Sequence, residues 1–499
     1  MDALASAVVS DLIGRCLSFL IARYQKHAAA SKLGRLHRLL LRARAVVEEA
    51  ETRHITNRGM LLQLGRLREG MYRGHYVLDA SRRLAAVSTR RRVLAARRRS
   101  SSSSPYFDAA AVVDGNNGEG AVEVSGDSMN ELQAVVDSLE AVLGDMKEFV
   151  VFLGGYPRVG RQPYSTYLHM GRCMFGRHGE MERVIEFLLR PCSLPGVLPI
   201  TGPPEVGKKT LVEHVCADDR VRKQFPLITH LCGDELGDGE YDLIPEHQEH
   251  VPSGGGSLII VEFAGAPDAS AWRRFYSSVS NSDKSSKIIV ISQTEQVSTL
   301  GTGQALRLAT LHKEEYWHFF KVLAFGSADP GDHPELASIA MDLVDELKGS
   351  FMAANILSRL MHSSMDARFW RRVLEVVRRG VRANYTAFGE HPSRLPGRSR
   401  LAYLCGAAED APLCFYYDWR KQTGTWRPGP AQSAELPKVT LQDVLDGRAV
   451  PRGEDKMGVL AWRSPIPPYY NYVTNCAVEA AAESLAVTRS SYLKRKRLR

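Results

Sequence analysis

The stretch Gly202-Pro-Pro-Glu-Val-Gly-Lys-Lys-Thr-Leu211 decides the fold of this 499-residue chain. It follows the pattern G-x-x-x-x-G-K-[ST] up to the last position, where a phosphate-binding loop carries the hydroxyl that holds Mg²⁺. Gly202, Gly207 and Lys208 keep the flexible turn and the ammonium for the β- and γ-phosphates, but Lys209 replaces the hydroxyl. The stretch therefore predicts a phosphate-binding scaffold that has lost its metal ligand.

The sequence around this loop alternates between short apolar runs and helical segments. A strand–loop–helix setting is the context that the motif needs, because the amides at the start of the helix hold the phosphates. Alternation of buried strands and helices is typical of an open parallel α/β sheet. We therefore expect a degenerate P-loop domain at 170–310, with strands at 197–201, 227–231, 258–261 and 288–291.

The residues expected to contact a nucleotide are Gly202, Glu205, Val206, Gly207, Lys208, Lys209 and Thr210. The Glu205 carboxylate lies on a loop that should wrap a polyphosphate, and the Thr210 hydroxyl comes one position too late. Hydrolytic P-loop proteins also place an acid at the end of a buried strand to hold Mg²⁺ or its waters. Here Glu262 and Phe263 follow that strand, and a phenyl ring cannot polarise a nucleophile. We expect a catalytically inactive protein with neither catalytic residues nor a metal.

Helical periodicity dominates the two regions that flank the P-loop domain. Apolar residues recur every three to four positions at 4–20, 33–47, 61–71 and 128–150, which predicts a four-helix, coiled-coil-type domain at 1–155. Clustered Arg, Ser and Gly predict a disordered insertion within it at about 90–127. A helical domain is expected at 311–385, after the P-loop domain.

The last segment, 386–499, is rich in Pro, Gly and aromatic residues and predicts a small irregular α+β region. It ends in the basic run Lys-Arg-Lys-Arg-Leu-Arg at 494–499, within a chain of net charge +9. Basic runs suit an acidic partner or a nuclear import receptor. Specific nucleic-acid recognition is disfavoured because stacking aromatic residues do not interleave with the basic clusters. The predicted fold class is thus multidomain α and α/β.

Two further features bear on where the chain works. Its eight cysteines form no C-x-x-C pair and no zinc spacing, which indicates reduced thiols. No stretch approaches the roughly 18–20 apolar residues of a membrane span. We expect a cytoplasmic protein that also enters the nucleus if the basic tail is an import signal.

Several eroded motifs follow one another along the chain, at 62–79, 174–180, 258–263, 286–293, 308–325 and 348–353. Their order resembles that of plant intracellular immune receptors, the disease-resistance proteins of the coiled-coil NB-ARC type. In the segment that resembles G-S-K-I-I-V-T-T-R, Gln293 replaces the arginine that would sense the γ-phosphate, and in the one that resembles K-G-L-P-L-A, Phe351 displaces the proline. No leucine-rich repeats follow these motifs.

The resemblance implies a defence-related protein whose relatives switch between ADP-bound and ATP-bound states. A switch needs nucleotide contacts that differ between its states, and the contacts to the metal and the γ-phosphate are altered here. ADP or ATP is the implied ligand, with ADP binding retained through the loop amides and Lys208 and with Mg²⁺ disfavoured. The implied role is a truncated receptor, helper or modulator that acts on other immune receptors or signalling proteins through the helical bundle.

Two alternatives stay open at this point. In the first, the chain is a working ATP/ADP-dependent switch with slow ATPase activity, in which Glu262 holds the metal through water and Thr210 shifts into register. In the second, the basic runs make the chain a nuclear or nucleic-acid-associated protein. The first alternative predicts Mg²⁺-dependent ATP binding, and the second predicts affinity governed by charge alone.

Overall fold

The computed structural model places two compact units, residues 1–166 with 327–338 and residues 167–326 with 339–499. Each unit is described by itself. The predicted helix at 4–20, most of the predicted insertion and the basic run at 494–499 lie outside the described residues. Those residues are 29–53, 55, 57–100, 126–158, 174–233, 236, 256–263, 265–282, 284–394, 400–404, 413–417, 436–445, 448–449, 457–464 and 471–478.

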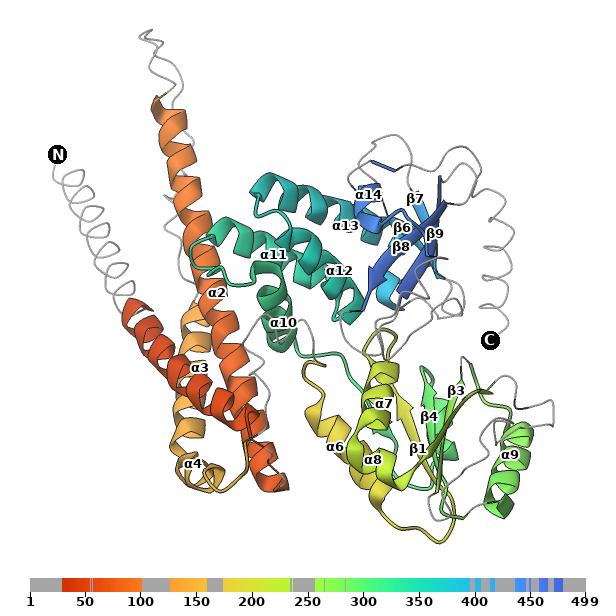
Figure 1. Cartoon of the computed structure of the whole chain (residues 1–499). Coiled ribbons are helices and arrows are strands. Elements are labelled where there is room, and N and C mark those ends of the chain that lie inside the picture. The colour runs from red at the N-terminus through yellow and green to blue at the C-terminus, as the bar shows by residue number, and fades with distance from the viewer. Residues whose placement is uncertain are drawn as a thin grey trace, which may run out of the picture. The chain divides into compact units, whose positions relative to one another are not determined.

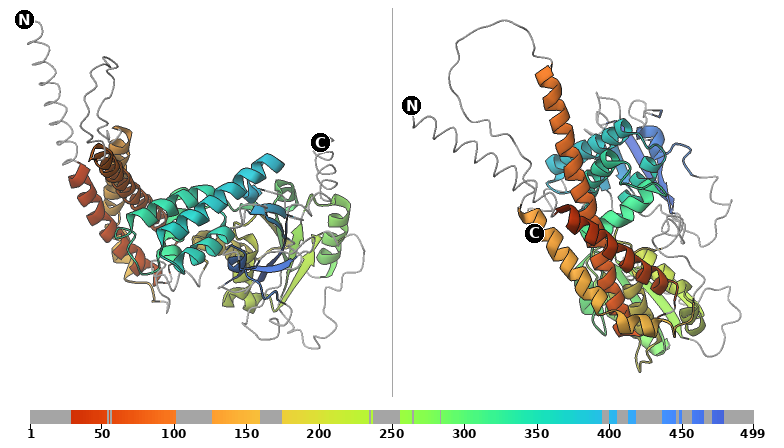
Figure 2. Two further views of the ribbon diagram at one scale, coloured as in Figure 1. Left: turned by 90° about the horizontal axis from the view of Figure 1, so that it is seen from above. Right: turned by 90° about the vertical axis from the view of Figure 1, so that its left-hand side faces the viewer.

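The first unit is helical. Its elements are a helix at 29–51, α2 (Arg58–Ser100), α3 (Gly126–Gly144) and α4 (Lys147–Leu153), and α2 and α3 run side by side (Figure 1, Figure 2). The helices approach closely at Gly74, where a Cβ atom would lie 2.7 Å from Leu40 Cδ2 and 3.1 Å from Leu139 Cδ1. Three of the four predicted helices are therefore present and share one apolar core.

The helix boundaries differ from the prediction in two places. Residues 90–100, predicted to begin the insertion, continue α2 to Ser100, because arginine and alanine are strong helix formers. The single helix predicted at 128–150 is two helices, broken after Gly144. The break changes the buried face, so that Phe149 is 1% exposed and Val150, predicted to face the core, is 49% exposed.

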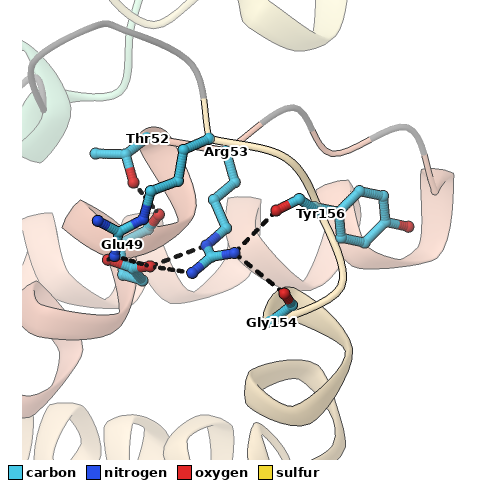
Figure 3. A network of polar contacts seen from close by, with 6 residues as sticks. Glu49, Thr52, Arg53, Gly154 and Tyr156 are labelled. Atoms are coloured by element: carbon cyan, nitrogen blue, oxygen red, sulfur yellow. Dashed lines mark hydrogen bonds and ion pairs between the residues drawn. The ribbon is translucent and has the colours of Figure 1, made fainter.

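An arginine joins the end of the first described helix to the segment after α4 (Figure 3). Arg53 donates from Nη2 to Glu49 Oε1 at 2.6 Å and from Nη1 to the carbonyl of Tyr156 at 2.8 Å. Arg158 adds a second cation, with Nη2 3.0 Å from Glu49 Oε1. The hydrogen bond from Arg53 holds the pKa of Glu49 below its ordinary value, with further lowering by Arg158.

This network predicts an acid-sensitive junction in the first unit. A carboxylate whose folded pKa is depressed contributes stability above its unfolded pKa, about 4.3, and loses it as the pH falls through the folded pKa. Glu49→Gln should remove that contribution, so the variant should lose less stability than the parent chain between pH 7 and pH 3. Hydrogen exchange of amides 150–156 across this range measures the difference. If the parent chain and Glu49→Gln lost the same stability between pH 7 and pH 3, Glu49 would not be the source of the acid sensitivity.

The second unit contains the predicted parallel sheet. Its order is β2-β3-β4-β1-β5, and every neighbouring pair is parallel. β1, β3 and β4 are buried along almost their whole length, as strands covered on both faces should be. The strands are β1 (Gly196–Thr201), β2 (Leu227–Cys232), β3 (Ser257–Phe263), β4 (Lys287–Ser292) and β5 (Leu306–Arg307).

Helices lie on both faces of this sheet (Figure 1) and pack on it through two apolar layers. One lies under α6 (His178–Leu189), α7 (Lys208–Ala217) and α8 (Asp219–Gln224), and the other under α9 (Ala269–Ser282). The successive residues of β3 alternate between them: Leu258 and Ile260 belong to the first layer, and Ile259 and Val261 to the second. The expectation of an open parallel α/β domain is confirmed.

Helices follow the sheet, as the periodicity predicted. They are α10 (Lys313–Phe325), α11 (Pro334–Leu347), α12 (Phe351–His362) and α13 (Ala367–Phe388), after the short η2 (Glu295–Leu300). α13 begins at an Asp366 cap, whose carboxylate accepts a hydrogen bond from the Phe369 amide at 2.9 Å. No helix within the described residues is long and apolar enough to cross a membrane.

The region after α13 contains a four-stranded antiparallel sheet of order β6-β7-β9-β8. Val444, Val459 and Cys476 form its small described core. The elements are η3 (Pro392–Arg394), β6 (Arg400–Leu404), β7 (Leu413–Tyr417), α14 (Leu441–Leu445), β8 (Met457–Arg463) and β9 (Asn471–Val478). The predicted α+β region is thus ordered around a regular sheet.

Candidate functional site

The loop between β1 and α7 is shaped by two glycines. Gly202 has a φ of +148°, and a Cβ atom there would lie 2.2 Å from the carbonyl oxygen of Leu308. Gly207 has a φ of +86° and caps the start of α7. Only glycine takes such backbone conformations at low cost. The chain beyond β5 therefore passes directly behind the loop, and the loop ends at the amides of a helix N-terminus, which favour an anion.

Lys208 lies folded over this loop. Its Nζ donates to the carbonyls of Gly202 at 2.7 Å and Pro203 at 2.6 Å, and the residue is only 9% exposed. Val206 is buried beneath the turn, and Thr210 is half-buried in the first turn of α7. The predicted loop residues are thus brought together, with the lysine held at the phosphate-binding turn.

The metal position is filled by an ion pair. Lys209 Nζ lies 2.9 Å from Glu262 Oε2, and the two side chains are 44% and 33% exposed. The ammonium thus comes from the position where a hydroxyl would bind Mg²⁺, and it engages the acid that would hold the metal or its waters. A lysine has no lone pair to offer a cation while protonated. The residues present do not fit a magnesium ion.

The other two degenerate positions behave differently from Glu262. Phe263 is 3% exposed and belongs to the layer under α9, with its ring centroid 6.1 Å from that of Trp272. Successive strand residues point to opposite faces, so Phe263 turns away from the side of Lys209. The assignment of Phe263 as a degenerate acid position stays a prediction. Gln293 follows β4 and is exposed.

A hydrogen-bonded latch connects the loop to α12. Glu205 has a φ of +61°, and its Oε2 accepts from Ser350 Oγ at 2.5 Å. Ser350 also caps α12 by accepting from the Ala353 amide at 3.1 Å, and its carbonyl accepts from Tyr316 Oη at 2.7 Å. Burial raises the pKa of Tyr316, and the Glu205 charge adds to the rise. We call Glu205, Ser350 and Tyr316 the loop latch.

Aromatic rings adjoin this latch. The centroid of Phe351 lies 5.2 Å from that of Phe319, which in turn lies 5.3 Å from that of Phe175. The Phe351 amide donates to the Glu205 carbonyl at 3.3 Å, so the residue that displaces the predicted proline contacts the loop directly. Phe175 and Phe319 are each 3% exposed, so these rings pack against one another behind the loop.

Arg177 is a second buried cation of the site. It is 5% exposed, lies 5.8 Å from the centroid of Phe351, and donates to the Ala309 carbonyl at 2.6 Å and to Glu180 at 2.9 Å. Its Nε is buried without a hydrogen-bond partner among the described residues. Nη2 also donates to the carbonyl of Val206 at 3.4 Å, so Arg177 supports the loop from the start of α6.

Sequence reasoning missed Arg177, Ser350 and Tyr316 as site residues. All three lie in segments that carry the family resemblance, at 174–180, 348–353 and 308–325. The signal was present, but spacing alone does not show which side chain of a segment turns toward a loop that lies 29 positions away for Arg177 and 145 for Ser350.

The antiparallel sheet also places a residue within the electrostatic reach of the loop. Burial raises the pKa of Tyr472 on β9, and the charge of Glu205 contributes to that rise. The ring of Trp462 on β8 lies 5.2 Å from that of Tyr472, centroid to centroid.

Comparisons with known proteins agree with the resemblance of the motifs. No family model matches the chain. Over 224 residues the chain is 25% identical to disease resistance protein RGA2 of Solanum bulbocastanum, an alignment that covers 40% of this chain and 23% of that protein. Putative disease resistance protein RGA4 of the same species is 24% identical over 224 residues, covering 40% and 22%. The chain thus spans less than a quarter of the length of these relatives.

Solved structures give looser similarities. Drosophila ORC bound to DNA aligns with a TM-score of 0.29 and 14% identity over 45% of this chain and 74% of that chain. Domain III of the Thermotoga maritima replication initiation protein DnaA aligns with a TM-score of 0.25 and 11% identity over 46% and 92%. The chain contains a P-loop α/β domain and shares sequence with plant disease resistance proteins over two fifths of its length.

Proposed function

We propose that this chain is a plant defence-related, NB-ARC-like protein that binds ADP without Mg²⁺ and does not hydrolyse ATP. It acts as a helper or modulator by protein–protein contact, through its helical N-terminal unit. The observation that carries the proposal is the 2.9 Å pair between Lys209 and Glu262. The similarity to disease resistance proteins supports the defence role.

The ion pair bears on catalysis through charge. Hydrolysis of a phosphoanhydride relies on a metal ion that neutralises the developing charge and on a group that orients the attacking water. Lys209 supplies one positive charge without a coordination site, and Phe263 is buried under α9. The loop amides and Lys208 remain to hold the phosphates of a nucleotide. Binding without turnover is the activity that these residues support.

This geometry also weighs against the working switch. For Glu262 to hold a metal through water, it would have to leave Lys209, and for Thr210 to replace Lys209, α7 would have to change register. An ATP/ADP switch further requires contacts that distinguish the two nucleotides. Gln293, at the position of the sensor arginine, is uncharged and exposed. The proposal is therefore a nucleotide-stabilised scaffold.

Restoring the hydroxyl tests the proposal directly. In calorimetric titrations of the full chain, ADP affinity should be the same with Mg²⁺ and with a chelator. Lys209→Thr should make ATP binding Mg²⁺-dependent, by roughly tenfold, the size of one charge-assisted contact of about 1.4 kcal/mol. Lys209→Met is the matched control, because it removes the ammonium without adding a metal ligand.

Three outcomes of these experiments would distinguish the proposed function from its alternatives. Mg²⁺-dependent preference of the parent chain for ATP, or phosphate release that Lys208→Ala abolishes, would overturn the inactive assignment. If the parent chain did not bind ADP, the nucleotide-binding part of the proposal would be wrong, and only the role as a protein–protein scaffold would stand. Mg²⁺ dependence in both Lys209 variants would show that the ammonium had only blocked a metal site built from other residues.

A further inference from the structure

The last long helix of the second unit is rich in arginine on one side. α13 contains six arginines and one glutamate, and it has no lysine. Four of the arginines are exposed to solvent: Arg368, Arg371, Arg372 and Arg382. At about 100° per residue, these four lie within an arc of roughly 100° on the helix. We call them the arginine face, and it runs about 21 Å along α13, at about 1.5 Å per residue.

The opposite side of α13 is buried in the core of the unit. Trp370 is 0% exposed, and its ring centroid lies 5.3 Å from that of Phe325. Val373, Leu374 and Val376 are buried as well. The apolar side of this amphipathic helix is therefore used for packing. It leaves the arginine face toward solvent and no apolar side of α13 to insert into a membrane interface.

The carboxylates around α13 leave an excess of positive charge on this face. On α11, Asp342 and Glu346 pair with Arg378 at 3.3 Å and 2.9 Å, at the margin of the arc. Asp366 is engaged at the start of the helix, where its side chain caps α13. Glu375 is the carboxylate that α13 itself places within the arc, and it is exposed. Four exposed arginines thus share their face with one carboxylate.

The residue types on this face favour a protein partner that is acidic. Protein interfaces are enriched in Arg, Tyr and Met and depleted in Lys. Met365 and Tyr385, which flank the face in sequence, are 37% and 49% exposed. A guanidinium binds a carboxylate through two parallel hydrogen bonds, which an ammonium does not offer. Nucleic-acid strands are held by aromatic rings that interleave with the cations, whereas here the exposed aromatic residue comes after the last arginine.

We propose that the arginine face docks an acidic helix of a partner protein. Residues three and four positions apart are neighbours on a helix surface, and Arg368, Arg371 and Arg372 have this spacing. A partner helix with Glu or Asp at the same spacing presents its carboxylates in a matching row, with a cation of the partner opposite Glu375. This surface belongs to the second unit, so it is distinct from the contacts proposed for the helical N-terminal unit and does not depend on a nucleotide.

A synthetic helix tests the proposal on the full chain. The probe is a fluorescently labelled alanine-based peptide of about 20 residues, long enough to be helical, with glutamates three and four positions apart. Binding is measured by fluorescence anisotropy, and the same peptide with glutamine in place of glutamate is the negative probe. We expect the glutamate helix to bind the parent chain and the glutamine helix to bind at least about tenfold more weakly, because charge-assisted hydrogen bonds carry the contact.

Two variants of equal net charge separate this face from general electrostatic attraction. The face variant combines Arg368→Gln, Arg372→Gln and Arg382→Gln and should bind the glutamate helix about tenfold more weakly, since each exposed ion pair contributes modestly. The matched control replaces three exposed arginines of α2 and α9: Arg66→Gln, Arg73→Gln and Arg273→Gln. The control should keep the affinity of the parent chain within about twofold, because salt screens distant charges.

Glu375→Gln should have an effect of the opposite sign. It removes the carboxylate from the face and should tighten binding of the glutamate helix by about two- to threefold, a gain that a damaged fold would not produce. Equal loss of binding in the face variant and the control would overturn the proposal, as would failure of the parent chain to bind the glutamate helix. Tighter binding of a labelled DNA duplex than of the peptide, lost in the face variant, would assign the face to nucleic acid instead.

Discussion

Gly202→Ala should lower the free energy of local unfolding of the P-loop domain by about 3–5 kcal/mol. This cost combines a penalty for the positive φ with an overpacked contact. The added Cβ atom would lie 2.2 Å from the carbonyl oxygen of Leu308, and neither backbone segment can move without disturbing β1 or β5. Native-state hydrogen exchange of the β1 and α7 amides should accelerate by a hundredfold or more, since about 1.4 kcal/mol is tenfold. ADP binding should also be lost, because the loop would no longer hold its conformation.

Two other glycines make this prediction specific. Gly207→Ala places its methyl group in open space, so only the positive φ of +86° opposes it and the cost should be about 1 kcal/mol. Gly179→Ala, in α6, meets no atom within 4 Å and should be neutral or stabilising by up to about 1 kcal/mol. A Gly202→Ala protein that exchanges like Gly207→Ala would contradict the packing of residue 308 behind the loop.

The parallel domain was predictable because its strands are covered on both faces. Such strands are continuous apolar runs, and the loop motif placed the first of them. The four predicted strands match β1 to β4 within two residues at each end. β5 comprises two residues and carries no periodic signal. The antiparallel order of β6 to β9 depends on pairings between distant segments, which no local pattern records.

The candidate site was predictable in its local part only. Gly202, Gly207 and Lys208 follow from the motif, and so does the loss of a metal ligand at Lys209. The direct pair between Lys209 and Glu262 joins residues 53 positions apart, and the spacing did not predict that the two would meet. Phe263 follows Glu262 directly, but strand alternation places the two side chains on opposite faces of β3, which adjacency in the sequence did not show.

The loop latch should contribute more stability than an ordinary helix cap. Ser350→Ala removes the α12 cap, about 1 kcal/mol, and a hydrogen bond to the Glu205 carboxylate, about 1.5–3 kcal/mol. We expect a total of about 2–4 kcal/mol, measured as faster hydrogen exchange of the α12 and loop amides. Asp366→Ala is the matched control, since that side chain only caps α13 and should cost about 1 kcal/mol.

A double-mutant cycle isolates the contact between the loop and the helix. Glu205→Gln keeps the size of the side chain and removes its charge, so the cycle with Ser350→Ala should give a coupling of about 1 kcal/mol or more. Additive effects would mean that the two residues merely lie close together. Because Glu205 belongs to the loop and Ser350 starts α12, a coupling of this size links loop conformation to helix position. A ligand that prefers one arrangement of the loop would then shift α12 by at most this coupling free energy, and partner binding at the helix would act back on the loop to the same extent.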